Sequence, residues 1–347
     1  MIFLRFILFP LVPVYAWIIF VRNYLFNKGV FKSHKVNAKI ISIGNIVIGG
    51  SGKTPTVIYI VNLTKNMGIK VGVLSRGYGR KSKGFQLVSD GKEILCDVTT
   101  CGDELILTAT ECRVPAAACE RRVEGAKKLL MQTNIETIIL DDAFQHRWIK
   151  RDLDILIFDQ YFLSKPGGID QNLIPTGLMR EPFTSVKRAD VIIINRKFSD
   201  YFPIPSVLLP YFEGKKIFNG YYKTAGIIDV KNHKFYNVEE FRNQKSLVVS
   251  GIARPASFLN ILRQYNINVD NRLIFKDHKR YTEKEVQRIR KKFYSTNSHS
   301  VITTSKDAVK LNQFGRQLDD IDIYYLKIEL EIDNKEEFKN LIIEKIK

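Results

Sequence analysis

Residues 44–55 read GNIVIGGSGKTP, and this stretch decides how the chain folds. A short apolar run, Lys39–Ile43, precedes it, and a segment with helix-like apolar spacing, 57–63, follows it. Strand, glycine loop and helix in this order form the context of a P-loop. Glycines let backbone N–H groups converge on phosphate oxygens, and the N-terminus of the helix adds partial positive charge. The stretch therefore predicts a site for a nucleoside triphosphate.

Two side chains of this loop have expected roles toward that nucleotide. Lys53 would reach the β- and γ-phosphates, and the hydroxyl of Thr54 would ligate Mg²⁺. The strict pattern G-x-x-x-x-G-K-[ST] places glycine where this chain has Val47. The residues expected to bind the nucleotide are Val47, Ile48, Gly49, Gly50, Ser51, Gly52, Lys53 and Thr54.

Composition indicates a globular, strongly basic protein. The 347 residues carry a formal net charge of +18, with 45% hydrophobic and 26% charged residues. A chain of this length forms one large or two ordinary domains. Basic proteins usually meet nucleic acid, an anionic membrane or a phosphorylated substrate. The four cysteines form no C-x-x-C pair, which argues against a zinc site or a disulfide framework and predicts buried thiols in a reducing cytosol.

The N-terminus carries an uncharged apolar run, Phe6–Val21. No small-x-small cleavage site follows it, so a signal peptide is not favoured. Its length corresponds to about 24 Å of helix, less than the ~30 Å of a bilayer core, and Pro10 and Pro13 interrupt its first turns. We expect residues 1–26 to form a monotopic, membrane-dipping helix flanked by basic residues that face anionic lipid. A core helix of a soluble domain is the alternative.

Beyond this helix, apolar β-branched segments alternate with helix-like ones. This pattern predicts an α/β fold with a P-loop NTPase-like, mostly parallel sheet covered by helices on both faces. A proline-containing segment, Lys197–Tyr222, reads as a hinge or linker. We therefore expect a P-loop kinase domain at 27–215 and a smaller C-terminal α/β domain at 216–347. The expected strands are Lys39–Ile43, Lys70–Ser75, Ile135–Leu140, Leu153–Phe158, Asp190–Ile194, Ser246–Ser250 and Ser300–Thr304.

Two groups of residues outside the P-loop could carry chemistry. Asp141 and Asp142 end a strand, where a Walker-B carboxylate that holds Mg²⁺ is expected. Asp103 lies in a loop, and His278 follows Asp277 far along the chain. An Asp–His pair would accept the proton of a sugar hydroxyl, although either residue alone is typical of a surface.

The order of motifs resembles the tetraacyldisaccharide 4′-kinase family, the membrane-bound lipid A kinases, over nearly the whole chain. The chain departs from the family pattern at Ala143, Lys279 and Ser305, and none of these removes a candidate catalytic group. The matching segments are Gly44–Pro55, Ser75–Arg80, Gly102–Glu104, Leu140–His146, Leu173–Pro182, Gly251–Pro255, Phe275–Thr282 and Thr304–Lys310.

This resemblance implies in-line transfer of the γ-phosphate of ATP, with Mg²⁺, to the 4′-hydroxyl of a lipid-linked glucosamine disaccharide 1-phosphate, forming lipid IVA. It implies that Asp103 with His278 is the base and that Asp141 and Asp142 serve the metal. It also implies that Arg180 and Glu181 lie near the reacting phosphate. Possible substrate contacts, weaker in support, are Arg76, Tyr78, Arg80, Gln145 and His146. The protein would be a monomer, peripheral on the cytoplasmic face of the bacterial inner membrane.

Two other functions remain as alternatives. A membrane-associated P-loop ATPase or GTPase switch would fit the loop, but a GTPase needs Asn/Thr-Lys-x-Asp after a strand. Asn195-Arg196-Lys197-Phe198 lacks the aspartate, and in Thr304-Ser305-Lys306-Asp307 the lysine is one place late. A nucleic-acid-dependent ATPase would fit the charge, but it gives the apolar N-terminus no role, and no recognition motif is visible. We therefore expect no nucleic-acid partner.

Overall fold

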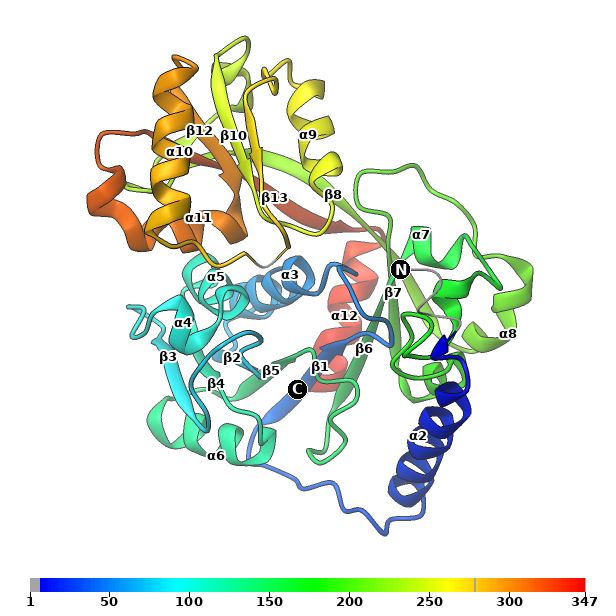
Figure 1. Cartoon of the computed structure of the whole chain (residues 1–347). Coiled ribbons are helices and arrows are strands. Elements are labelled where there is room, and N and C mark those ends of the chain that lie inside the picture. The colour runs from blue at the N-terminus through cyan, green and yellow to red at the C-terminus, as the bar shows by residue number, and fades with distance from the viewer. Residues whose placement is uncertain (1–6, 278, 347) are drawn as a thin grey trace.

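A continuous α/β sheet forms the centre of the molecule (Figure 1). The structure is a computed structural model that describes residues 7–277 and 279–346. The predicted strands Ser246–Ser250 and Ser300–Thr304 occur with the expected bounds. The strands are β1 Lys39–Gly44, β2 Val71–Ser75, β3 Gln86–Asp90, β4 Pro115–Ala118, β5 Thr137–Asp141, β6 Leu153–Asp159, β7 Val191–Asn195, β8 Lys216–Asp229, β9 Phe235–Tyr236, β10 Ser246–Ser250, β11 Arg272–Ile274, β12 Ser300–Thr304 and β13 Ile323–Ile332.

The strand order is β11-β10-β12-β13-β8-β7-β6-β1-β5-β2-β4-β3, with β9 paired to β8. Pairing is parallel except at the β3 edge, between β8 and β13, and between β8 and β9. β1 lies between β5 and β6, and its residues are almost fully buried, as expected for a strand covered on both faces. The predicted α/β fold with a mostly parallel sheet is confirmed.

Helices cover both faces of the sheet. α3 and α5 pack with α12 on one face of β1 and β5, and α6 packs on the other. The α-helices are α2 Leu11–Asn27, α3 Lys53–Asn66, α4 Val98–Cys101, α5 Asp103–Cys112, α6 Arg122–Gln132, α7 Gln160–Leu163, α8 Leu209–Phe212, α9 Pro255–Gln264, α10 Glu283–Ser295, α11 Ser305–Leu311 and α12 Lys335–Ile346. The 3₁₀ helices are η1 Ile169–Gln171, η2 Phe183–Arg188, η3 Ser206–Leu208, η4 Val238–Phe241 and η5 Asn312–Leu318.

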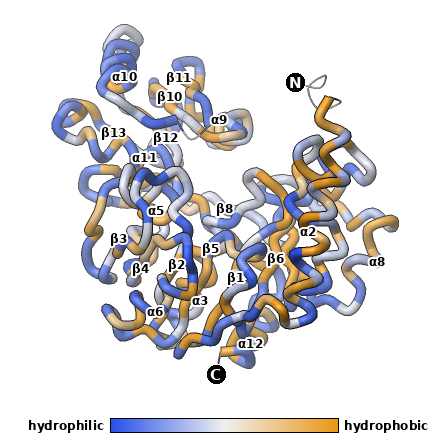
Figure 2. The backbone as a smooth tube through the Cα atoms, turned by 60° about the horizontal axis from the view of Figure 1, so that its bottom comes forward, coloured by the Kyte–Doolittle hydropathy of each residue, from blue (hydrophilic) through white to orange (hydrophobic). Residues whose placement is uncertain are grey.

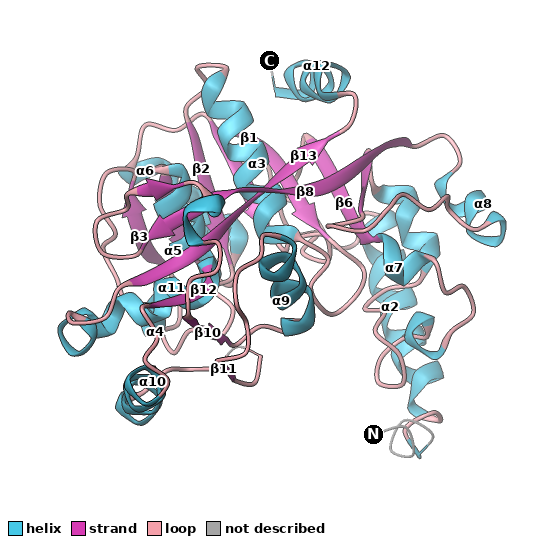
Figure 3. Cartoon of the chain, turned by 90° about the horizontal axis from the view of Figure 1, so that it is seen from above, coloured by secondary structure: helices cyan, strands magenta, loops and turns pink. Residues whose placement is uncertain are grey.

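The long antiparallel pair β8 and β13 joins two lobes, as Figure 3 shows from above. We call the part built on β1–β7 the P-loop lobe and the part built on β10–β12 the C-terminal lobe. Leu330 and Ile332 of β13 are buried in the core of the P-loop lobe, whereas Ile323 and Tyr325 are buried in that of the C-terminal lobe. Strand β8 begins within Lys197–Tyr222, the segment predicted to be a hinge or linker. The two lobes are therefore connected by paired strands.

The last helix of the chain returns to the P-loop lobe. Phe338 of α12 is fully buried, 5.0 Å from Phe218 and 6.1 Å from Tyr59 between ring centroids. The core of the P-loop lobe is therefore built from both ends of the chain. It depends on residues beyond the 27–215 segment that the sequence analysis assigned to it.

Helix α2 lies along the edge of the P-loop lobe, and its tube is largely hydrophobic in Figure 2. Residues 1–6 of the helix predicted over 1–26 lie outside the described residues, and α2 ends one residue beyond the predicted end. Among the described residues, no helix combines the length and the apolar character needed to cross a membrane. The exposed apolar residues on and before α2 are Ile7, Phe9, Leu11, Val14, Trp17, Ile18, Phe20 and Tyr24.

Candidate active site

The P-loop connects the end of β1 to the start of α3. Gly49 and Gly52 adopt φ values of 116° and 96°, in the left-handed region that favours glycine. Lys53 is the first residue of α3, and the side chain of Thr54 behind it is buried. The loop thus has the strand–turn–helix geometry that presents backbone N–H groups to phosphate.

The valine at the position of the missing glycine has a structural role. Val47 is 8% exposed and forms an antiparallel bridge with Met179 in a shared hydrophobic cluster. Ile48 N donates to Leu178 O at 2.7 Å, and Arg180 N donates to Ile46 O at 2.7 Å. The segment around Arg180 therefore pairs with the first part of the P-loop, which a glycine at position 47 would pack less well.

Three charged side chains meet beside the P-loop. Arg180 Nη1 donates to both carboxylate oxygens of Asp142 at 3.1 and 3.0 Å, and Lys53 Nζ lies 3.7 Å from Asp142 Oδ1. Burial works to raise the pKa of Asp142, but Lys53 and Arg180 outweigh it and hold that pKa below its usual value. Asp142 is thus an anion between two cations, and both cations are close to the expected position of the transferred phosphate.

Asp141 has a different environment from its neighbour. It is 5% exposed, and its Oδ2 accepts a hydrogen bond from Ser75 Oγ at 3.3 Å. Burial, together with the charges of Glu104 and Asp142, raises the pKa of Asp141 to about 7. Among the described residues its Oδ1 is buried without a hydrogen-bond partner. A buried carboxylate oxygen without a partner fits a site that receives a cation.

Asp103, expected in a loop, is the first residue of helix α5, and the start of this helix contacts the C-terminal lobe through helix α11. Lys310 Nζ lies 3.2 Å from Asp103 Oδ2, and Lys306 forms an ion pair with Glu104. Burial works to lower the pKa of Lys306, but Glu104 outweighs it and raises that pKa. The two lysines come from the Thr304–Lys310 motif, to which the sequence analysis assigned no role. The two lysines are four residues apart and therefore lie on one face of a helix, which was the available sequence signal that they act together.

His278, the predicted partner of Asp103, lies outside the described residues. The residue before it, Asp277, lines the same cleft as the P-loop. The pairing of Asp103 with His278 stays a prediction.

A cleft of about 1610 Å³ is lined by Lys53, Asp141, Asp142 and Arg180 and by the Glu104–Lys306 pair, whereas Asp103 and Lys310 are not among its lining residues. Its walls come from the P-loop, from α2 through Tyr15, Ile19 and Arg22, and from the start of α9. A cavity of this size exceeds the volume typical of a drug-sized ligand, so it can hold a nucleotide together with part of a second, larger substrate.

The chain matches the family model described as tetraacyldisaccharide-1-P 4'-kinase over residues 4–347. The chain belongs to this 4'-kinase family. The tetraacyldisaccharide 4'-kinase of Chlorobaculum parvum is 37% identical over 82% of this chain and 78% of that protein. The enzyme of the same name from Flavobacterium psychrophilum is 34% identical over 98% of this chain and 96% of its own length.

A solved structure supports the same relationship. The crystal structure of LpxK from Aquifex aeolicus in complex with ATP superposes with a TM-score of 0.81 at 29% identity, covering 99% of this chain and 100% of that one. The predicted family and the predicted kinase activity are thereby confirmed, and the ATPase or GTPase switch is not favoured.

Glu181 is placed differently from Arg180 within this 4'-kinase fold. Its side chain is 0% exposed, and its Oε2 accepts hydrogen bonds from Arg188 at 2.7 Å, Ser185 at 2.8 Å and Asn23 at 3.0 Å. Glu181 is not among the residues that line the cleft. Its contacts hold η2 and α2 together beneath the site.

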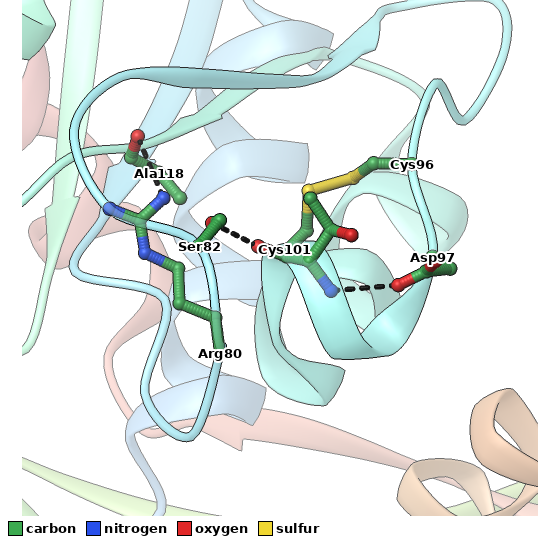
Figure 4. Close-up of a disulfide and its surroundings, with 7 residues drawn as sticks. Arg80, Ser82, Cys96, Asp97, Cys101 and Ala118 are labelled. Carbon is green, nitrogen blue, oxygen red and sulfur yellow. Dashed lines mark hydrogen bonds between the residues drawn. A yellow bond between two sulfur atoms is a disulfide. The ribbon is translucent and has the colours of Figure 1, made fainter.

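The predicted substrate contacts divide into two groups. Arg76, Tyr78, Gln145 and His146 line the cleft. Burial, with help from nearby arginines, lowers the pKa of His146 to about 4, so its imidazole is neutral at neutral pH. Arg80 is not among the lining residues, but it forms a 2.6 Å ion pair with Glu120, which does line the cleft. Arg80 also donates to Ala118 O at 3.4 Å (Figure 4).

The interpretation of all four cysteines as thiols was wrong for one pair. Cys96 and Cys101 form a disulfide, as Figure 4 shows. Gly102, the N-cap residue of α5, follows Cys101 in the chain. Cys112 and Cys119 are free and buried. The bonded pair does not follow the C-x-x-C spacing, and helix α4, which ends at Cys101, places the two Cα atoms 6.3 Å apart.

Proposed function

We propose that this protein transfers the γ-phosphate of ATP to the 4′-hydroxyl of a tetraacyldisaccharide 1-phosphate, a lipid-linked glucosamine disaccharide, forming lipid IVA. The observation that carries the proposal is the Lys53–Asp142–Arg180 cluster at the P-loop, in a cleft that the apolar helix α2 also lines. The ATP held by the related Aquifex aeolicus enzyme supports ATP as the donor.

The cluster is suited to phosphoryl transfer, in which charge spreads over the oxygens of the moving group. Lys53 would bind the β- and γ-phosphates from the first turn of α3. Arg180 would stabilise the developing charge with its fixed fork of donors. Asp142 keeps both cations in place before the nucleotide arrives, so little reorganisation is needed during the reaction.

Mg²⁺ is the metal that the donor set fits. Among the described residues, no group of three or more His, Cys, Asp or Glu side chains could hold a metal. Mg²⁺ needs fewer protein ligands, because it usually keeps waters and binds through one or two carboxylates plus substrate phosphates. The hydroxyl of Thr54 and the carboxylates of Asp141 and Asp142 would hold it. When bound, it would neutralise charge on the nucleotide phosphates.

Activation of the acceptor hydroxyl falls to Asp103 with His278 in this proposal. Asp103 is 6% exposed and its carboxylate is fixed by Lys310, so it can orient a neighbouring imidazole. A carboxylate that fixes the tautomer of a histidine makes that histidine a better base.

The lipid substrate requires access to a membrane. The exposed apolar side of α2 is followed by the exposed Lys28, Lys32 and Lys35, an arrangement that suits an interface with anionic head groups. We propose peripheral attachment of a monomer to the cytoplasmic face of the bacterial inner membrane, with α2 forming the boundary between lipid and cleft.

Incubation of the purified protein with radiolabelled ATP, Mg²⁺ and a disaccharide 1-phosphate in mixed micelles tests the function. Label transferred to the lipid is the expected result. Release of labelled inorganic phosphate without labelled lipid would contradict the proposal and favour the membrane-associated ATPase.

A further inference from the structure

Asn195 lies directly beneath the P-loop, although it belongs to a different strand. It is the last residue of β7 and is 0% exposed. Its Nδ2 donates to Ser51 O at 3.2 Å and to Tyr222 Oη at 3.0 Å, and its Oδ1 accepts from Lys197 N at 2.9 Å. A buried amide with this many partners has one orientation, so Ser51 receives a fixed donor.

Tyr222 completes the contact from strand β8. A Cβ built on Gly52 would overlap the amide of Asn195 and would lie 2.5 Å from Tyr222 Oη. The glycine therefore rests against both side chains. Tyr222 is held in turn, because its N–H donates to Lys197 O at 2.8 Å and its ring packs edge-on against Phe198 at 5.5 Å.

These contacts determine how the peptide between Ser51 and Gly52 is turned. In a trans peptide the carbonyl oxygen and the following N–H point in opposite directions. Because Asn195 holds the carbonyl oxygen of Ser51, the N–H of Gly52 is directed away from Asn195. Ser51, Gly52 and Tyr222 all line the cleft, whereas Asn195 does not.

We propose that Asn195 and Tyr222 are positioning residues that orient the Ser51–Gly52 peptide for the phosphates of the nucleotide. They act through the P-loop backbone and set the affinity for ATP, with little effect on the transfer step. The inference rests on the proposed function in taking ATP as the nucleotide. Because Tyr222 belongs to a strand that continues into the C-terminal lobe, it also links that strand to the nucleotide site.

Two variants of the full-length protein in detergent micelles test the proposal. Tyr222→Phe removes one hydroxyl and should weaken binding of a fluorescent ATP analogue by about 2- to 10-fold. Asn195→Ala also leaves Lys197 N unpaired and should weaken it by about 10- to 100-fold. The KM for ATP should rise in parallel, while kcat and the KM for the lipid stay within about twofold of wild type because those interactions are untouched.

Tyr221→Phe is the matched control, since Tyr221 is the neighbour on β8 and lies outside the cleft lining. It should bind the analogue as wild type does. Unchanged analogue affinity in both test variants overturns the proposal, whether or not their thermal stability falls. If Asn195→Ala does not fold, Tyr222→Phe decides alone. Failure of the proposed function would give a different result, because the wild-type protein would then transfer no label to the lipid.

Discussion

The hydroxyl of Tyr15, on helix α2, donates a hydrogen bond to the backbone carbonyl of Arg180 at 2.8 Å. Arg180 in turn binds Asp142 beside the P-loop. On the same helix, Arg22 donates to Gln145 O, and Asn23 donates to Glu181. The helix that we propose to meet the membrane therefore also supports the loops that carry the active-site charges.

Tyr15→Phe tests this support. Loss of the hydroxyl leaves the Arg180 carbonyl without its donor, and we expect kcat to fall by about 2- to 10-fold. Binding to anionic vesicles should not change, because Phe is as apolar as the ring it replaces. Tyr24→Phe on the same helix, with an exposed ring, is the control. Equal kinetics for the two variants would show that the hydroxyl of Tyr15 gives the active site no support.

Arg180→Ala should remove a cation that the transition state needs. We expect kcat to fall by about 10²–10³-fold, as for loss of one preorganised donor to developing charge. Arg180→Lys keeps the charge but loses the planar guanidinium whose Nη1 contacts both oxygens of Asp142, so it should recover only part of this loss. Steady-state kinetics with saturating ATP provide the measurement. Full recovery by lysine would mean that the planar fork has no role.

Glu181 is expected to act on stability, although the sequence resemblance places it at the reacting phosphate. Glu181→Ala leaves the side chain of Arg188 without its buried anion, and removal of one member of a buried pair costs about 3–5 kcal/mol of unfolding free energy. Urea denaturation measures this cost. The Mg²⁺ concentration that gives half-maximal activity should stay unchanged, and a large shift in it would instead identify Glu181 as a metal ligand.

The environment of His146 predicts a pH dependence of stability. The folded-state pKa of about 4 lies below the ordinary value of 6.5, so between these pH values the unfolded chain binds more protons. The unfolding free energy should therefore fall as pH decreases from 6.5 toward 4, by up to about 2 kcal/mol between pH 7 and pH 5.

Denaturation of His146→Gln at both pH values isolates this contribution. The variant should lose less stability than wild type on acidification. His299→Gln, at an exposed position, should behave as wild type does. An unchanged slope in His146→Gln would show that other groups cause the acid sensitivity.

Local sequence patterns predicted the strands whose own residues form an uninterrupted apolar or β-branched run. The strand Ser300–Thr304 was predictable because a run of β-branched residues covered on both faces is a strong signal. Strand β13 was not predicted, since charged residues such as Lys327 and Glu329 interrupt its apolar pattern and its two ends belong to different cores. Its antiparallel partner is β8, and no local signal specifies that pairing.

Some features of the active site were likewise predictable from the sequence, and others were not. Asp142 directly follows β5, and Lys53 and Thr54 follow β1 through the P-loop, so the sequence places them at one sheet edge. The contacts of Asn195 with Ser51, and of Lys310 with Asp103, join residues far apart in the chain. Glu181 adjoins Arg180 in sequence, yet the two side chains contact different groups, which sequence adjacency cannot reveal.

The cysteines provide the last prediction, a count of thiols in three conditions. Burial raises the pKa of Cys112 to about 12, and the buried Cys119 also has a raised pKa. The thiolate is the reactive species, so neither residue should react with an aromatic disulfide reagent at pH 8 in the native protein. Unfolding without reductant should expose these two thiols, and reduction should then release Cys96 and Cys101.

Ser substitution at Cys96 and Cys101 together should leave the unfolded, unreduced count unchanged. A higher count in the unfolded, unreduced wild-type protein would show that the disulfide is absent from the purified enzyme.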